Sequence, residues 1–237
     1  MYDVTVIGGG SGGYAAAIRA AQLGAGVSLI ECAETGGTCV NRGCIPSKVW
    51  LKAANLLNNL KTGKDFGINA SLESIDFKAL VERKSGVSAE IRMGMEALLQ
   101  NNGVEVIRGR AALKSQREVD VDGQVVETKT VIIATGSSLS MPDTPGLKEF
   151  AMTTDDVLEM TAVPASILVC GGGFIEVEMA FLLAAFGCKV SIAPEGPRIL
   201  PKEDADTSQR IGQALRDGGI AILPRASLAS IQPSGND

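Results

Sequence analysis

A strand, a glycine-rich turn and a helix follow one another at the start of this chain, and this order restricts its fold more than any other feature. Residues 2–7 form an apolar run typical of a buried strand, and Gly8, Gly10 and Gly13 follow in the pattern G-x-G-x-x-G. Backbone N–H groups of such a turn, at the positive end of a helix, bind a pyrophosphate. Glu31 ends the next predicted strand, where a carboxylate bonds ribose hydroxyls. The unit therefore predicts dinucleotide binding, without choosing between FAD and NAD.

The same order of elements returns between residues 167 and 193. Two such units predict an α/β fold with two Rossmann-like, three-layer dinucleotide-binding domains, the second of them incomplete. Residues 137–146 are rich in Ser and Pro and are typical of a connector. We therefore expect an FAD-binding domain over residues 1–149 and a truncated NAD(P)-binding domain over residues 150–237.

Further elements are predicted between and around the glycine turns. The expected helices cover residues 14–23, 45–60, 77–101 and a segment ending at Gly187, and the expected strands cover 27–30, 104–107, 118–121, 125–131, 167–170 and 190–193. Asp122 and Gly123 are a hairpin signal.

Composition excludes several classes of function. Hydrophobic residues make up 45% of the 237, the net charge is −5, and no Lys/Arg stripe suggests nucleic acid as a partner. The apolar runs are short or carry charges, and no leader precedes the first strand, so we expect a cytoplasmic protein without a membrane span. The five cysteines then predict a working disulfide rather than a structural framework, with Cys32, Cys170 and Cys188 packed as small apolar residues. No histidine occurs, and we expect no metal site.

Two cysteines, Cys39 and Cys44, flank four residues just after the first unit. In a regular helix this spacing corresponds to a rise of about 7.5 Å, beyond the usual limit of roughly 7 Å between α-carbons in a disulfide. A bond would need a distorted backbone, which Gly43 and Pro46 permit. The pair is thus either a redox-active disulfide at a helix start or two ordinary reduced cysteines.

The segment from Gly36 to Lys48, GGTCVNRGCIPSK, resembles the active-site signature of the pyridine nucleotide-disulfide oxidoreductases. Its end, IPSK, is closer to the dihydrolipoamide dehydrogenases than to the glutathione reductases, and mercuric reductases are close competitors. Ala134, Thr135 and Gly136 resemble the turn between the FAD and NAD domains of this family. The resemblance implies that Gly8, Gly10, Gly13, Glu31, Gly37, Thr38, Lys48, Ala134, Thr135 and Gly136 contact FAD.

The resemblance also implies catalytic roles. Cys39 would be the thiol that meets the substrate, and Cys44 the thiol beside the flavin. Lys48 would approach the flavin N5 region with Glu178 as its partner, and Phe174 would be an aromatic gate between flavin and nicotinamide. From the residues alone, Phe174 could equally pack in a core, and Glu178 could lie on a solvated helix face.

The second glycine turn departs from the pattern. Gly171 and Gly173 are followed by Glu176 where a small residue is expected, and its carboxylate would face a pyrophosphate. Pro194 stands where Glu31 stands in the first unit, and Glu195 follows one residue late. We still predict a nicotinamide dinucleotide at Gly171, Gly173, Phe174 and Glu195, and NAD rather than NADP because no basic pair for a 2′-phosphate is evident, although NADP is not excluded.

The function implied by the resemblance is electron transfer between NAD(H), FAD, the Cys39–Cys44 disulfide and a dithiol or disulfide substrate such as lipoamide. Relatives continue into a C-terminal interface domain that forms a homodimer and supplies a histidine base. We therefore expect this chain to turn over poorly by itself. The alternatives are a mercuric reductase-like or other disulfide reductase, and a non-catalytic FAD-binding fragment.

Overall fold

The computed structural model describes residues 1–234. Internal contacts divide the chain into two compact units: the first comprises residues 1–48 and 82–139, and the second comprises residues 49–81 and the chain from residue 140 onward. The fold is of the predicted α/β class, with one sheet in each unit. The predicted domain division at residue 150 stays a prediction.

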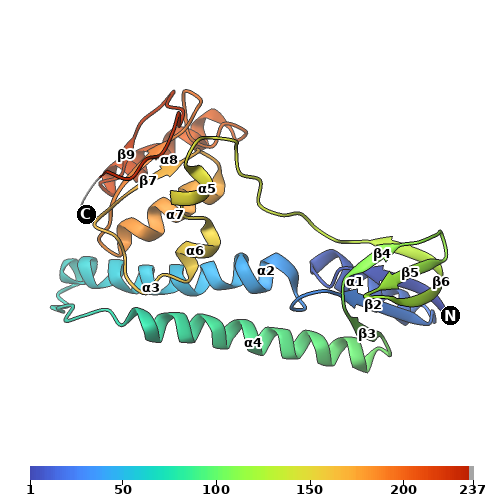
Figure 1. Ribbon diagram of the computed structural model, residues 1–237. Coiled ribbons are helices and arrows are strands. Elements are labelled where there is room, and N and C mark those ends of the chain that lie inside the picture. The colour runs from blue at the N-terminus through green and yellow to red at the C-terminus, as the bar shows by residue number, and fades with distance from the viewer. Residues whose placement is uncertain (235–237) are drawn as a thin grey trace. The chain divides into compact units, whose positions relative to one another are not determined.

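The first unit is built on a mixed sheet in the order β3-β2-β1-β6-β5-β4 (Figure 1). Its strands are β1 (Tyr2–Ile7), β2 (Val27–Glu31), β3 (Glu105–Arg108), β4 (Ala111–Leu113), β5 (Glu118–Val121) and β6 (Gln124–Ile133). Strands β3, β2, β1 and the second half of β6 are parallel, whereas β5 pairs antiparallel with the first half of β6 and β4 pairs antiparallel with β5. The carboxyl ends of β1, β2 and β6 therefore lie at one edge, where ligands bind in folds of this kind.

Both faces of this sheet are apolar. Val6 and Leu29 contribute to one cluster with residues of α1 and α4, while their neighbours Ile7 and Ile30 contribute to another on the opposite side. The helices with residues in this unit are α1 (Ser11–Gln22), α2 (Gly37–Arg42), α3 (Cys44–Thr62) and α4 (Phe77–Asn101). Helices α3 and α4 also contribute residues to the second unit.

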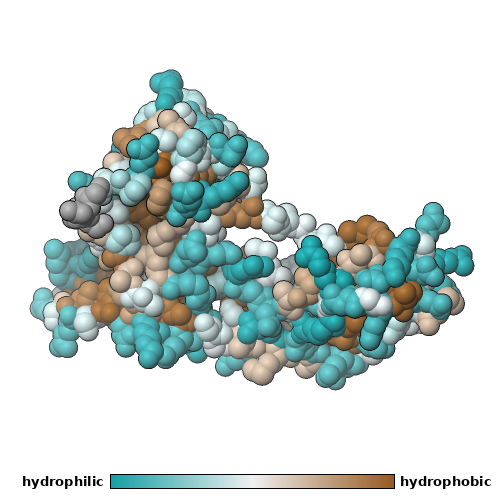
Figure 2. Space-filling view, viewed as in Figure 1, coloured by the Kyte–Doolittle hydropathy of each residue, from teal (hydrophilic) through white to brown (hydrophobic). Residues whose placement is uncertain are grey.

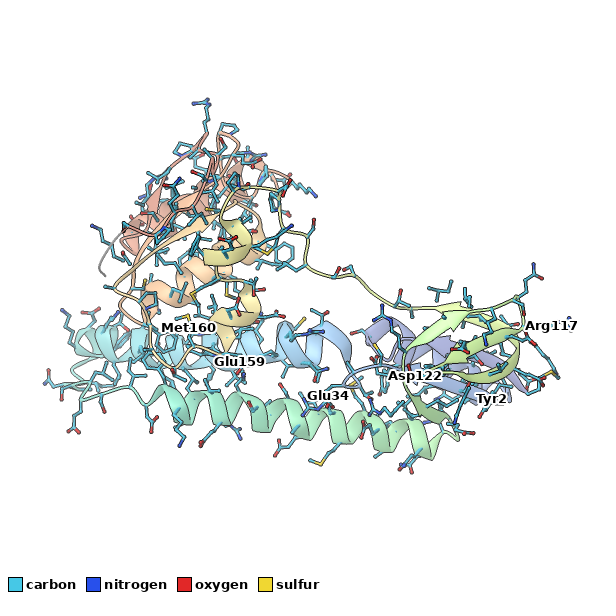
Figure 3. The ribbon with its side chains drawn as sticks, viewed as in Figure 1. Tyr2, Glu34, Arg117, Asp122, Glu159 and Met160 are labelled. Carbon is cyan, nitrogen blue, oxygen red and sulfur yellow. The ribbon has the colours of Figure 1, made fainter. Side chains whose placement is uncertain are left out.

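The hairpin between β5 and β6 follows its sequence signal. Asp122 and Gly123 both have positive φ, 51° and 93°, as a two-residue primed turn requires. Asp122, labelled in Figure 3, also accepts a hydrogen bond of 3.1 Å from the N–H of Arg110 through its Oδ2. The turn sets the antiparallel register of β5 on β6.

The second unit contains a parallel sheet in the order β7-β8-β9. Its strands are β7 (Ser166–Cys170), β8 (Lys189–Ala193) and β9 (Ala221–Ile222), and its own helical segments are η1 (Gly63–Phe66), α5 (Leu147–Phe150), α6 (Thr154–Leu158), α7 (Phe174–Ala185) and α8 (Ala205–Asp217). Helix α6 begins with a capping box, an arrangement in which the side chains of Thr153 and Asp156 each accept a hydrogen bond from the backbone N–H of the other residue.

Trp50 lies at the centre of the second unit's core and is fully buried. Its ring packs edge-on against Phe186 at a centroid distance of 5.3 Å and lies 6.1 Å from Phe77. Its Nε1–H donates a 3.2 Å hydrogen bond to the Leu158 carbonyl, so the only polar atom of the ring is satisfied. The buried side of α7 completes this core through Ala180, Leu182 and Leu183.

The structure corrects several sequence predictions. The first helix begins at Ser11 rather than Tyr14, so Gly13 lies inside it. Cys32 and Cys170 are exposed, whereas Cys188 is buried as predicted.

In the part of the chain that the structure describes, no helix is long and apolar enough to cross a membrane. Figure 2 shows apolar patches interspersed with polar surface on the visible face.

Candidate functional site

At two positions of the turn after β1, neighbouring backbone lies too close for any residue other than glycine. Gly8 has φ +106°, donates its N–H to the Ile30 carbonyl at 2.8 Å, and would overlap the Ala134 carbonyl oxygen if it carried a Cβ. A Cβ on Gly13 would overlap the carbonyl oxygen of Gly8. These two positions let strand β1, helix α1 and the segment after β6 come together. The structure thus brings Gly8, Gly13 and Ala134 to one place.

Gly10, the middle glycine of the pattern, is different. A Cβ built there would meet no protein atom closer than the Gly37 Cα at 3.7 Å, an ordinary contact. Internal packing therefore does not demand glycine at this position, and the bare backbone there fits the approach of a ligand. A Cβ on Gly37 would lie 2.8 Å from the Gly10 Cα, so the start of α2 approaches the start of α1 beside Gly10. The positive end of α1 favours a negatively charged group there.

Glu31 at the end of β2 is buried, with 9% of its surface exposed. Its Oε2 accepts a 2.6 Å hydrogen bond from the Gly9 N–H, and its Oε1 accepts one of 2.8 Å from the Ala33 N–H. These charge-assisted bonds hold the carboxylate against the glycine turn. Glu31 therefore lies beside the turn, where a ribose would lie next to a bound pyrophosphate, and the residues of the first turn fit FAD.

The cysteine segment has the backbone break that its spacing requires. Helix α2 ends at Arg42, Gly43 has φ −137° and ψ −111°, and α3 begins at Cys44. Both cysteines are thiols, and a hydrogen bond between their side chains is the main cause that raises the pKa of Cys39 above its ordinary value. Burial and the charge of Cys44 raise the pKa further, while a backbone hydrogen bond with Cys44 and the positive charge of Lys48 lower it.

A network missed by the sequence analysis holds this segment in place. The Asn41 side-chain amide donates to the carbonyls of Gly37 at 2.9 Å and Thr35 at 3.2 Å. Arg92 of α4 donates to Asn41 Oδ1 at 2.8 Å and lies 3.4 Å from the carboxylate of Glu34, which is labelled in Figure 3. The position of Asn41 between the two cysteines could have indicated that its side chain matters for this segment. Its partner Arg92, however, is far away in the sequence.

The remaining predicted flavin contacts also belong to the first unit. Thr38 lies in the first turn of α2, Thr135 and Gly136 follow β6, and Lys48 lies one turn after Cys44 in α3. Glu178 belongs to the second unit, so its pairing with Lys48 stays a prediction. Phe174 begins α7 and is 73% exposed, which excludes the core-packing alternative within the described structure.

The second glycine turn has a backbone like that of the first but different side chains around it. Gly171 and Gly173 precede α7 as Gly8 and Gly10 precede α1. The side chain of Glu176, however, lies against both glycines, and Glu195 is an exposed residue beyond the end of β8. These residues do not fit a dinucleotide pyrophosphate as the first turn does.

Comparison with known proteins places the chain in a family. The family described as "Pyridine nucleotide-disulphide oxidoreductase" matches residues 2–237, so the chain belongs to it. A dihydrolipoyl dehydrogenase of Acholeplasma laidlawii is 42% identical over 97% of this chain and 70% of its own length. A dihydrolipoyl dehydrogenase of Zymomonas mobilis is 36% identical over 98% of this chain and 51% of its own length.

A solved structure has the same fold. The HOCl-induced flavoprotein disulfide reductase RclA from Escherichia coli matches with a TM-score of 0.82 and 30% identity, over 95% of this chain and 49% of that protein. The chain therefore spans between about half and 70% of the length of these relatives. The matched family agrees with the resemblance of residues 36–48, and the solved structure agrees with the predicted α/β fold class.

Proposed function

We propose that the first unit binds FAD at its glycine turn and that Cys39 and Cys44 are a redox-active pair acting on a dithiol or disulfide such as lipoamide. The observation that carries the proposal is the backbone break at Gly43, which separates Cys39 in α2 from Cys44 at the start of α3 and removes the regular helical spacing between them, in the same compact unit as the turn with Glu31. The similarity to dihydrolipoyl dehydrogenases supports lipoamide as the substrate class.

The residues proposed to hold FAD share one edge of the sheet or the adjoining starts of α2 and α3. They are Gly8, Gly10, Gly13, Glu31, Gly37, Thr38, Lys48, Ala134, Thr135 and Gly136. When bound, FAD supplies a two-electron acceptor and donor for the cysteine pair.

The exchange reaction balances between the pair and a dithiol. In the oxidised pair, Cys39 Sγ is bonded to Cys44 Sγ. A substrate thiolate attacks Cys39 Sγ, which forms a mixed disulfide and breaks the bond to Cys44, whose sulfur leaves as a thiolate. The second substrate thiol loses its proton and attacks the substrate sulfur of the mixed disulfide, which releases Cys39 and closes the substrate disulfide. The substrate has then lost two electrons, and the pair has gained them.

We further propose that the chain by itself turns over slowly. The pKa of Cys39 is raised, so little of it is thiolate near neutral pH, and the 237 residues contain no histidine that could serve as base. By similarity to the dihydrolipoyl dehydrogenases, of which the chain spans about half to 70%, the whole protein is proposed to be a homodimer.

The test is the visible spectrum of the purified chain before and after anaerobic addition of dihydrolipoamide. We expect a flavin spectrum that gains a long-wavelength charge-transfer band in the wild type and lacks the added band in Cys39→Ser and Cys44→Ser. Flavin without the band in the wild type would indicate a non-catalytic FAD-binding fragment. A band with other thiols or dithiols but not with dihydrolipoamide would favour a different disulfide reductase, in line with the solved relative.

Gly10→Ala tests the cofactor site separately. The nearest protein atom to the new methyl group is an ordinary contact at 3.7 Å, and the φ of −73° at Gly10 is allowed for alanine, so the variant should fold. It should nevertheless retain less flavin, because the methyl group would stand where the pyrophosphate approaches. Flavin content equal to that of the wild type would argue against this placement.

A further inference from the structure

The two glycine turns of this chain have nearly the same backbone, so each serves as a reference for the other. Gly8 and Gly171 have φ values of +106° and +117°, and their N–H groups bond the carbonyls of Ile30 and Ala193 at 2.8 and 2.9 Å. The residue before each helix is an extended glycine, with φ −73° in the first turn and −77° in the second. The differences between the turns therefore lie in side chains.

The first difference is the third position of the pattern. Gly13 packs against Gly8, but its counterpart Glu176 carries a side chain that folds back over the turn. A Cβ built on Gly173 would lie 2.8 Å from Glu176 Oε2, and one built on Gly171 would lie 3.0 Å from Glu176 Cγ. The carboxylate thus occupies the space next to the two bare backbones that a pyrophosphate would approach.

The second difference is the residue after the second strand. In the first unit, a Cβ on Gly9 would meet Glu31 Oε2 at 3.0 Å; in the second, a Cβ on Gly172 would meet the Pro194 Cβ at 2.7 Å. Proline fills the place of the ribose-binding carboxylate and offers no side-chain hydrogen-bond acceptor. The second turn therefore lacks the polar contact for the ribose and has a negative charge in place of the phosphate.

We infer that Glu176 is a specificity-determining residue that excludes nicotinamide dinucleotides from the second turn. Glu176 belongs to the first turn of α7, where the positive end of the helix dipole stabilises its carboxylate. A pyrophosphate would have to displace this carboxylate or lie next to it, and like charges at such short range repel. The inference concerns the second unit only, and flavin binding by the first unit is measured independently of it.

The experiment measures binding of NAD⁺ and of ADP-ribose to the 237-residue chain by isothermal titration calorimetry. Glu176→Ala removes the carboxylate while keeping a helix-forming residue and a Cβ that the turn already accommodates. Glu176→Gln keeps the size and removes only the charge. We expect Glu176→Ala to bind both ligands at least tenfold more tightly than the wild type, with Glu176→Gln between them. Testing ADP-ribose shows that the gain arises at the pyrophosphate and ribose rather than at the nicotinamide.

Asp206→Ala is the matched control. Asp206 lies in the first turn of another helix of the same unit, α8, so its removal changes the net charge equally without altering the turn. This variant should bind as weakly as the wild type. The inference is overturned if wild type and Glu176→Ala have equal affinity, if neither binds, or if Asp206→Ala gains as much as Glu176→Ala. Thermal unfolding followed by Trp50 fluorescence verifies that the second unit of each variant is folded.

Discussion

Gly13→Ala compared with Gly12→Ala tests the packing of the first turn. Both glycines lie in α1, so both substitutions gain the same helix propensity, about 0.5–1 kcal/mol each. A Cβ on Gly12 meets nothing within 4 Å, whereas one on Gly13 overlaps the Gly8 carbonyl oxygen and lies 3.2 Å from the Ala134 Cβ. The difference between the variants is therefore the cost of overpacking alone, about 1–3 kcal/mol.

Urea unfolding followed by circular dichroism measures this difference. With a denaturant slope of about 1–3 kcal/mol per molar urea, Gly13→Ala should unfold on the order of 1 M earlier than Gly12→Ala. Hydrogen exchange of the β1 amides assigns the loss to the first unit, because β1 packs directly on this turn. A Gly13→Ala midpoint equal to or above that of Gly12→Ala would refute the close approach of helix and strand.

Three further changes test the core and the cysteine segment. Trp50→Phe leaves a buried carbonyl without its donor and should lower the free energy of unfolding by about 1–3 kcal/mol, measured by thermal denaturation; no loss would contradict the central position of this ring. Asn41→Ala should raise hydrogen exchange of the loop before α2 by about tenfold, and Arg92→Ala should raise it less, because each removes a different share of the same network. Cys44→Ala removes the hydrogen bond and the charge that raise the pKa of Cys39, so alkylation of Cys39, followed by peptide mass spectrometry, should shift to lower pH; an unchanged profile would mean that the thiols do not interact.

Sequence reasoning predicted elements whose signals are local. The bounds of β1, β5 and α4 agree with the prediction, because an apolar run, a hairpin signal or an Asn-Asn-Gly stop marks each of them. The Gly103 after α4 has φ +72°, the conformation that ends a helix with little steric cost. Such signals depend only on neighbouring residues and need no knowledge of the tertiary fold.

Elements with weak local signals were missed. Strand β9 has only two residues and exists through its pairing with β8, and β4 is also short, although its partner β5 lies close by in the sequence. Helix α8 could have been predicted, since the apolar residues Ile211, Ala214 and Leu215 recur at helical spacing. In the candidate site, the glycines and Glu31 follow a sequence pattern, but the Arg92–Asn41 contact joins residues that only the fold brings together.

The two glycine turns differ in whether the protein itself places a negative charge at the start of the following helix. Helix α1 has no acidic residue in its first turn, and the nearby carboxylate of Glu31 is held to one side by Gly9 and Ala33, so the start of α1 remains available to a ligand phosphate. Helix α7 carries Glu176 in its first turn, so the carboxylate of its own side chain provides the negative charge that the positive end of the helix favours. A ligand that binds only the folded state stabilises it by an amount that rises with the logarithm of its free concentration relative to its dissociation constant. FAD should therefore stabilise the first unit, while nicotinamide dinucleotides should leave the stability of the second nearly unchanged until Glu176 is replaced.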